Sequence, residues 1–375
     1  MRRERSARPP KEDPTKPPGL LLINLGTPDS PRPSDVRRYL REFLSDPRVF
    51  DMPALERWLI LNLFILPTRP KSSGEAYEKI WTDRGSPLLF HSRDLAAKVQ
   101  ERLDGEVVVD LAMRYGKPSI REALTRFHDR GIQRIVVFPL YPQYSSAATG
   151  SSVEKVFEIA SELWNVPYLH VVPPFYDHPD YVAACVEEAR PVIEEGKPEK
   201  IFFSFHGLPE RHVRKSDRTG KHCLVLEDCC SGLVDANLEC YRAQCYESAR
   251  LLAAALDVPA DRQVVCFQSR LGRDPWIRPF TDVVIDEAAR SGVKRAVVMS
   301  SAFVADCLET LEELGIRAVR DFRANGGEEL RLVPAPNSSD AWADAVVVIA
   351  REASNWLGGP GPRAVAPRRY VAGSV

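Results

Sequence analysis

Short runs of apolar, largely β-branched residues recur along the 375-residue chain and alternate with segments of helical periodicity. Strands that alternate with helices predict parallel sheets built from β-α-β units, which is the α/β fold class. Two such units account for the runs better than one large sheet does. The runs are LLLINLG (20–26), VVVDLAMRY (107–115), IVVFPLY (135–141), YLHVVPPF (168–175), IFFSFHG (201–207), VVCFQSR (264–270) and AVVMSSAF (296–303).

The chain divides into two halves between two polar ends. We place the boundary at residue 160, after a loop rich in Ser, Thr and Gly, so that the halves are 19–160 and 161–357 and the strand run 168–175 falls in the second. The ends, 1–18 and 358–375, are rich in proline and charged residues, and we expect them to be disordered tails.

Charge and targeting signals narrow the possible partners and the compartment. The 51 Lys and Arg residues balance 52 Asp and Glu residues, so the chain has no excess positive charge with which to bind nucleic acid. No apolar run follows the charged start of the chain, and we therefore expect a cytoplasmic protein whose cysteines are reduced.

Candidate catalytic residues follow the expected strands, because sites in open α/β sheets form at the carboxyl ends of strands. His206 ends the run IFFSFHG, where an imidazole, which titrates near neutral pH, can serve as a general base; a structural histidine is the commoner alternative. Asp306, Glu309 and Glu313 share one face of the helix expected after the run 296–303. Such a face is usually solvated, but its carboxylates could also bind a divalent cation. No GxGxxG motif follows a strand, which argues against a dinucleotide cofactor.

The segment LERWLILNLFILP (55–67) is apolar nearly all round if it is helical. It is too short to span a bilayer, which needs about 20 residues. Two interpretations remain open from the residues alone: a buried core helix, or an exposed apolar lip that meets a membrane or an apolar ligand.

Five of the eight cysteines lie in the strand-free segment 221–245. In a reducing compartment this clustering favours metal or redox chemistry over disulfides. Four thiolates satisfy a [2Fe–2S] cluster or a zinc ion, although the C-x-x-C pairs usual for zinc are missing. Reactive or merely buried thiols are the third possibility. The five residues are Cys223, Cys229, Cys230, Cys240 and Cys245.

Seven motifs along the chain resemble those of ferrochelatases, in the family's order and over about residues 19–355. The resemblance implies two Rossmann-like halves that enclose a porphyrin cleft. It also implies insertion of Fe(II) into protoporphyrin IX, with release of two protons, to form protoheme. The motifs are LLINLGTPDSP, GSPLLF, MRYGKPSI, PLYPQYSSAATGSS, SFHGLPERH, FQSRLGRDPWIRPFTD and FVADCLETLEELG.

The resemblance also implies roles for single residues. His206 matches the family's active-site histidine, and Glu309 matches the acid that faces it across the macrocycle, so that the Fe(II) substrate meets these two. Asp306 and Glu313 match an acidic path that leads away from the site. The segment 55–67 matches a lip that dips into the membrane, and we expect it to contact a membrane or an upstream enzyme of porphyrin synthesis. Positions that resemble porphyrin contacts are Leu25, Ser86, Arg114, Tyr115, Tyr144 and Trp276.

The chain departs from the family pattern at three places. Cys307 stands where some relatives carry a histidine. Ser146 replaces a cysteine that ligates the cluster of animal ferrochelatases, and no cysteine follows Cys307, so we expect no cluster of the animal type. The insertion 221–245 resembles a subset of bacterial ferrochelatases with internal [2Fe–2S] ligands. We expect Cys223, one of the Cys229/Cys230 pair, Cys240 and Cys245 to be the ligands, because neighbouring side chains diverge.

Other functions stay open from the sequence. Coproporphyrin could be the substrate, or cobalt the inserted metal, although the apolar lip favours protoporphyrin IX. A porphyrin or iron–sulfur sensor without catalysis is a more distant possibility, because both His206 and Glu309 are present.

Overall fold

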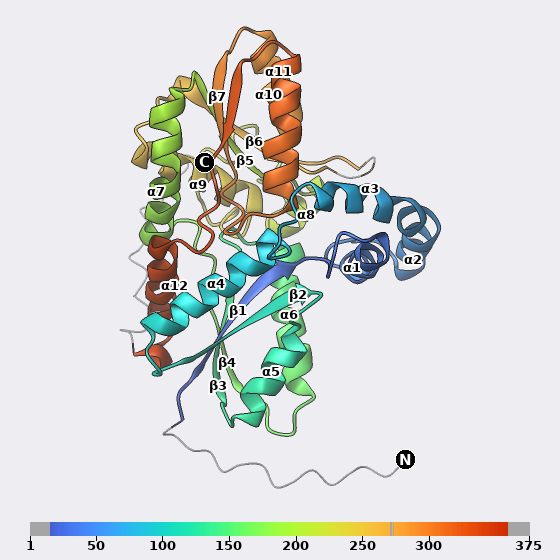
Figure 1. Cartoon of the computed structure of the whole chain (residues 1–375), viewed down its shortest axis with the longest axis vertical. Coiled ribbons are helices and arrows are strands. Elements are labelled where there is room, and N and C mark those ends of the chain that lie inside the picture. Colours follow the sequence, from blue (N-terminus) through green and yellow to red (C-terminus); the bar gives the residue numbers. More distant parts are fainter. Residues whose placement is uncertain (1–15, 271, 273, 359–375) are drawn as a thin grey trace.

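The computed structural model describes residues 16–270, 272 and 274–358, and its strands form two four-stranded sheets (Figure 1). All pairings within both sheets are parallel, as the alternation of strands and helices predicts. The first sheet has the order β2-β1-β3-β4 and the second the order β6-β5-β7-β8, so the two follow one plan. The strands are β1 (Gly19–Gly26), β2 (Val108–Tyr115), β3 (Arg134–Pro139), β4 (Tyr168–Val171), β5 (Lys200–His206), β6 (Gln263–Gln268), β7 (Arg295–Met299) and β8 (Glu329–Leu332).

Helices cover both faces of each sheet, which explains the nearly continuous apolar runs in the central strands. Residues Leu20–Ile23 of β1 and Phe202–Phe203 of β5 are fully buried. The helices of the first half are α1 (Pro33–Ser45), α2 (Ala54–Ile60), η1 (Leu61–Ile65), α3 (Leu66–Glu78), α4 (Pro87–Arg102), α5 (Ile120–Asp129), η2 (Ser146–Gly150) and α6 (Ser151–Ser161). Those that follow are α7 (Pro179–Gly196), α8 (Glu210–Ser216), α9 (Tyr241–Ala255), η3 (Ala260–Arg262), α10 (Thr281–Arg290), η4 (Glu309–Ala318), α11 (Val319–Ala324), α12 (Asp340–Ala353) and η5 (Asn355–Leu357).

The run 168–175, which the sequence analysis assigns to the second half, belongs to the first sheet. Its residues 168–171 form β4, the edge strand that pairs with β3. The next strand, β5, begins the second sheet. A helix that returns to the same sheet and one that leads to another sheet have the same amphipathic pattern, so periodicity could not assign this strand.

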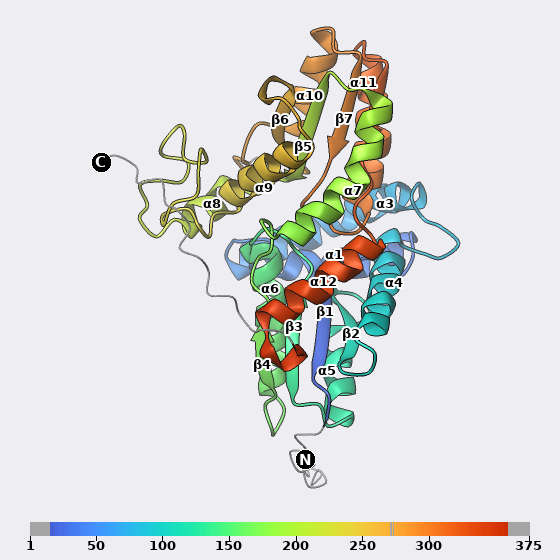
Figure 2. The same ribbon diagram turned by 90° about the vertical axis from the view of Figure 1, so that its left-hand side faces the viewer.

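The last long helix joins the two halves. α12 packs against α4 of the first half and α7 of the second (Figure 2). Trp342 on α12 is fully buried and its ring lies 5.7 Å from that of Phe175 and 5.8 Å from that of Tyr181. The expected tail 358–375 lies outside the described residues except for Gly358, and the tail 1–18 except for residues 16–18.

Two segments project from this framework. Helices α1, α2 and α3 extend to one side at the level where the halves meet (Figure 1). The cysteine-rich insertion contains no strand, as expected; its residues 221–240 lie in turns and loops between α8 and α9, and residues 241–245 begin α9. None of the helices in the described part of the chain is long and apolar enough to cross a membrane.

Candidate active site

A cleft with a cavity volume of about 720 Å³ opens between the two halves. Its walls come from β1 and α1 of the first half, and from the ends of β5 and β6 together with η4 of the second. The size and the mixture of apolar walls with a few polar groups fit a site for a small organic ligand.

His206 is the last residue of β5 and reaches the cleft from the strand end. Its Nδ1 lies 2.6 Å from the backbone carbonyl oxygen of Gly207. A carbonyl can only accept, so Nδ1 carries the proton and the lone pair of the ring is on Nε2. The next residue must be small, since a Cβ on Gly207 would lie 2.8 Å from the Gln268 carbonyl oxygen. The imidazole is therefore held in the tautomer that can accept a proton at Nε2.

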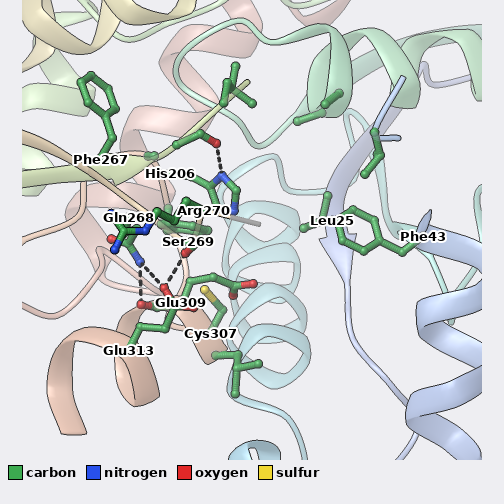
Figure 3. A pocket seen from close by; sticks show the side chains of 18 of the residues that line it. Leu25, Phe43, His206, Phe267, Gln268, Ser269, Arg270, Cys307, Glu309 and Glu313 are labelled. Atoms are coloured by element: carbon green, nitrogen blue, oxygen red, sulfur yellow. Dashed lines mark hydrogen bonds between the residues drawn. The ribbon is translucent and has the colours of Figure 1, made fainter. Parts of the chain in front are cut away.

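Two carboxylates of the π-helix η4 enter the same cleft (Figure 3). Gln268 at the end of β6 donates from Nε2 to the Glu309 backbone carbonyl at 2.8 Å. The Ser269 hydroxyl donates to the Glu313 carboxylate. Burial, and then the charge of Glu309, raise the pKa of Glu313 above its usual value of 4.5. The strand end of β6 thus contacts two acids, one of which has a raised pKa.

The opposite wall of the cleft is apolar. Leu25 and Phe43 point toward the space beside His206 and Glu309 from the first half (Figure 3). Trp276 lies in the loop after β6 and is held by a backbone bridge to Pro209. Cys307 also lines the cleft, and burial followed by the nearby Glu309 raises the pKa of its thiol well above the usual value. A flat apolar ligand fits between these walls with polar groups at one side.

The structure brings six of the ten expected non-cysteine site residues to the cleft. These are Leu25, Ser86, His206, Trp276, Glu309 and Glu313.

Four of the expected residues lie outside the cleft lining in this structure: Arg114, Tyr115, Tyr144 and Asp306. Arg114 and Tyr115 both bond to the buried carboxylate of Asp46, at 2.6 and 2.9 Å. The backbone amide of Tyr144 donates to Gln244. The Asp306 carboxylate accepts from the Thr310 hydroxyl and the Asn337 amide, each at 2.8 Å, and so joins the helix start to a neighbouring loop.

The sequence places Gln268 and Ser269 among the strand-end positions where sites form but assigns them no role, and it does not identify Tyr241; all three line the cleft. Gln268 ends β6 and Ser269 follows it, so their place at the carboxyl end of a strand was the available signal. Tyr241 starts α9, and no local pattern distinguishes it from a core tyrosine.

Four of the five insertion cysteines lie together, and all are buried. Cys223 and Cys230 share hydrogen bonds with Cys240, and Cys229 Sγ lies 3.8 Å from Cys230 Sγ. The Arg242 guanidinium contacts Cys230 Sγ at 3.1 Å and Cys229 Sγ at 3.7 Å. We refer to Cys223, Cys229, Cys230 and Cys240 as the thiol cluster.

The arrangement of the thiol cluster differs from the expectation in two respects. Cys245 stands apart, with its thiol bonded to Tyr241. The adjacent Cys229 and Cys230 both take part, because they lie in a turn, where neighbouring side chains need not diverge as they do in a strand. Within the described ranges, no group of three or more His, Cys, Asp or Glu side chains has an arrangement that could hold a metal ion.

The expected lip forms one continuous helical stretch across α2, η1 and α3. Leu61 and Leu66 are buried against α1, whereas five large apolar side chains of α2 and η1 face outward. The exposed fractions are Leu55 70%, Trp58 57%, Leu59 38%, Leu63 58% and Phe64 67%. We refer to these five residues as the apolar lip.

Fold and site together define a two-lobed α/β enzyme whose cleft combines an imidazole, two acids and an apolar wall. The family model described as Ferrochelatase matches residues 17–354, and the chain belongs to this family, whose members insert iron into a porphyrin. Ferrous iron and the porphyrin are therefore its substrates, and it acts in heme synthesis.

Curated relatives agree with this assignment. A ferrochelatase of Legionella pneumophila (strain Lens) is 44% identical over 335 residues, which cover 89% of this chain and 98% of the relative. A ferrochelatase of Coxiella burnetii (strain Dugway 5J108-111) is 44% identical over 334 residues, covering 89% and 93%. Among solved structures, the sirohydrochlorin chelatase SirB of Bacillus subtilis subspecies spizizenii in complex with cobalt is 13% identical, with a TM-score of 0.48, covering 90% of this chain and 94% of that one.

Proposed function

We propose that His206 accepts the pyrrole protons during metallation. We propose also that the carboxylates of Glu309 and Glu313 bind ferrous iron or the water that it loses. The inner nitrogens of the porphyrin must lose two protons while ferrous iron loses water. The hydrogen bond from Nδ1 to the Gly207 carbonyl carries the proposal, because it leaves Nε2 as an acceptor in the cleft. Carboxylate oxygens are suitable ligands for ferrous iron or its water.

Substitution of His206 tests this role. We expect His206→Ala to bind porphyrin but to metallate it at least about 100-fold more slowly, the range in which a general base contributes. His128→Ala, which removes an exposed histidine on α5, is the matched control and keeps its activity. Metallation at a normal rate by a folded His206→Ala protein would show that another group takes the protons.

The substrate we propose is protoporphyrin IX. The apolar wall and the exposed lip suit the more apolar porphyrin, whereas coproporphyrin carries additional carboxylates. Anaerobic rates with ferrous iron and each porphyrin compare the two, and cobalt in place of iron tests the metal. A much faster rate with coproporphyrin would overturn this choice. No metallation of either porphyrin would favour a sensor that binds porphyrin without catalysis.

We further propose that the thiol cluster binds a [2Fe–2S] cluster. Support comes from the donor set: four buried sulfurs from one short segment are linked in a chain, Cys223 to Cys240, Cys240 to Cys230 and Cys230 to Cys229, beside the cationic Arg242. The side-chain positions described are not those of a loaded site, so the proposal rests on the number and chemistry of the donors. When bound, such a cluster would cross-link the insertion to the start of α9.

Metal analysis of protein purified without oxygen tests the proposal. We expect about two iron atoms per chain and red-brown absorption, both lost in Cys230→Ser. Cys266→Ser, in which a buried thiol of β6 is removed, and Cys245→Ser keep the iron. One zinc atom per chain in place of iron would establish the zinc alternative. Absence of both metals would leave the cysteines as packed thiols.

The apolar lip, we propose, attaches the enzyme peripherally to a membrane or to an enzyme that supplies porphyrin. Five large apolar side chains on successive turns of one helical face are exposed next to the cleft wall formed by Phe43 and Ile65. An exposed patch of this kind marks an interaction surface. Its position would let an apolar porphyrin pass into the cleft without crossing water.

A further inference from the structure

Tyr241 contacts the backbone of the catalytic histidine. Its hydroxyl donates to the His206 carbonyl oxygen at 2.9 Å. The residue is 8% exposed, starts α9 and lines the cleft. Burial raises the pKa of Tyr241 well above its usual value, so the hydroxyl keeps the proton that it donates.

At this point the end of β5 is paired on one side only, that of β6, where the Gly207 amide also donates to the Gln268 carbonyl at 2.7 Å. β5 pairs with β7 only as far as Phe203, whereas on its other side it pairs with β6 up to His206 and Gln268. The His206 ring is bonded to the Gly207 carbonyl, so a shift of this backbone carries the imidazole with it. The Tyr241 hydroxyl is therefore placed to hold the reacting nitrogen in position.

The same turn of α9 also belongs to the thiol cluster. Cys240, directly before Tyr241, is the N-cap of α9 and bonds to Cys223 and Cys230. Arg242, directly after it, contacts Cys230 Sγ at 3.1 Å. Cys240 and Arg242 thus contact the thiols, and Tyr241 between them contacts the His206 backbone. Gln244 fixes this turn further, by accepting from the Tyr144 amide at 2.6 Å and donating to the Leu238 carbonyl at 2.7 Å.

We propose that Tyr241 is a positioning residue that couples the thiol cluster to His206. A change in the contacts among the four thiols shifts the backbone at the start of α9, and the hydrogen bond of the Tyr241 hydroxyl transmits that shift to the His206 backbone. Coupling of this kind is reciprocal, so porphyrin bound beside His206 must also alter the thiols. The inference rests on the proposed role of His206 as proton acceptor.

The positioning role is tested with Tyr241→Phe, which removes only the hydroxyl. Tyr181→Phe is the matched control, since it removes a similar buried bond, from the Tyr181 hydroxyl to the Ser301 carbonyl at 2.6 Å, in which the histidine takes no part. Rates are divided by the number of porphyrin-binding sites titrated in each preparation. We expect Tyr241→Phe to lower kcat per site about tenfold with KM for porphyrin unchanged, as for a misplaced catalytic group. Tyr181→Phe keeps the wild-type kcat per site. Equal values of kcat per site in the two variants would overturn the positioning role.

The coupling is tested by the rate at which N-ethylmaleimide labels Cys223, Cys229, Cys230 and Cys240 in the purified protein. Mass spectrometry of the insertion peptide distinguishes them from the other cysteines. We expect porphyrin to change the labelling rate about threefold or more in the wild type and in Tyr181→Phe, but not in Tyr241→Phe. A porphyrin effect that is the same in all three proteins, or absent from the wild type, would overturn the coupling.

The outcome for His206→Ala distinguishes a failure of the proposed proton-acceptor role from a failure of the inference about Tyr241. If His206→Ala retains activity, the proton-acceptor role fails, whatever Tyr241→Phe shows. If His206→Ala is inactive and Tyr241→Phe behaves like Tyr181→Phe, only the inference about Tyr241 fails.

Discussion

At the scale of single residues, neighbouring acids on η4 have opposite environments. Burial and the charge of Glu309 raise the pKa of Glu313. For Glu312 burial acts in the same direction, but hydrogen bonds from Arg317 and Lys79 outweigh it and lower the pKa below 4.5. Glu313 faces the cleft, whereas Glu312 is bound to Lys79 at 3.0 Å across the interface with α3. The charge of Glu313 therefore lowers the stability of the folded protein, and its position in the cleft suits function instead.

This contrast predicts opposite stability changes for two conservative variants. The native state holds the Glu313 proton more tightly than the unfolded chain does, so the free energy of unfolding falls as pH rises above about 4.5. Glu313→Gln removes this loss, and we expect its melting temperature at pH 7 to exceed that of the wild type by about 1–3 °C. For Glu312, whose native pKa is lowered, stability is present above 4.5 and is lost as pH falls. Glu312→Gln is therefore less stable than the wild type at pH 7.

Thermal unfolding from pH 3 to pH 8 measures both effects. The Glu313→Gln difference should shrink as pH falls to about 4.5, whereas the Glu312→Gln difference should shrink only as pH falls further, through the lowered native pKa of Glu312. Glu313→Gln should also metallate more slowly, because a carboxylate in the cleft is lost. A Glu313→Gln protein that is less stable than the wild type at pH 7 would contradict the assignment.

The position of a residue after a strand predicted its place in the cleft better than its chemical type did. His206 and Glu309 reach the cleft because parallel strands end at the same edge of a sheet. The strand ends can be located in the sequence. Arg114 and Tyr115 also end a strand run, but the buried Asp46 binds both side chains. That carboxylate comes from the end of α1, so the decisive contact joins distant parts of the chain and has no local signal.

At the scale of elements, sequence indicated the helices and strands but not which helical face is exposed. A segment that is apolar nearly all round fits both a core helix and a lip, and only packing against α1 shows that Leu61 and Leu66 face inward. Helix periodicity also assumed α geometry at 306–314, whereas residues 309–318 form a π-helix. Asp306 precedes this helix, and its carboxylate is held by Thr310 and Asn337, contacts that no residue type signals in the sequence.

The apolar lip predicts membrane binding that depends on its exposed side chains. Burying each large apolar side chain is worth about 1.5–3 kcal/mol, so we expect Leu63→Ser with Phe64→Ser to weaken vesicle binding at least about tenfold. Cosedimentation with vesicles of phosphatidylcholine and phosphatidylglycerol measures the binding. Activity with porphyrin in detergent should change little.

Trp164→Ser provides the control for the lip variants. Trp164 is 93% exposed but lies on the loop between α6 and β4, away from the lip. This variant should bind vesicles as the wild type does. If the wild type itself fails to sediment with vesicles, the lip would instead have to meet a protein that delivers porphyrin.

At the scale of the whole molecule, two sheets of one plan border the cleft, and a buried hydrophobic core with residues of both sheets joins them. α12 packs on both halves at one side, with Lys98 of α4 bound to Asp340 at 3.0 Å. On the side of the cleft, Asp51 of the first half meets α8 of the second. Its carboxylate lies 2.7 Å from Lys215 Nζ, 3.5 Å from Arg211 Nε and 3.7 Å from His212 Nε2. One anion of the first half thus binds three basic groups of the second, directly before the lip.

The Asp51 contact predicts how fast heme leaves the cleft. The hydrogen bond from Lys215 lowers the pKa of Asp51, so the contact is charged at neutral pH. In Asp51→Asn the attraction is lost and the Lys215 and Arg211 cations repel, which loosens the halves at this point. With about 1 kcal/mol for a half-exposed pair, we expect heme to dissociate about fivefold faster, and added salt to speed release from the wild type. Stopped-flow transfer of heme to apomyoglobin measures the rate.

Glu210→Gln, which breaks a pair with Arg214 within α8, should release heme as the wild type does. Equal rates for Asp51→Asn and the wild type would mean that the halves need not separate for heme to leave.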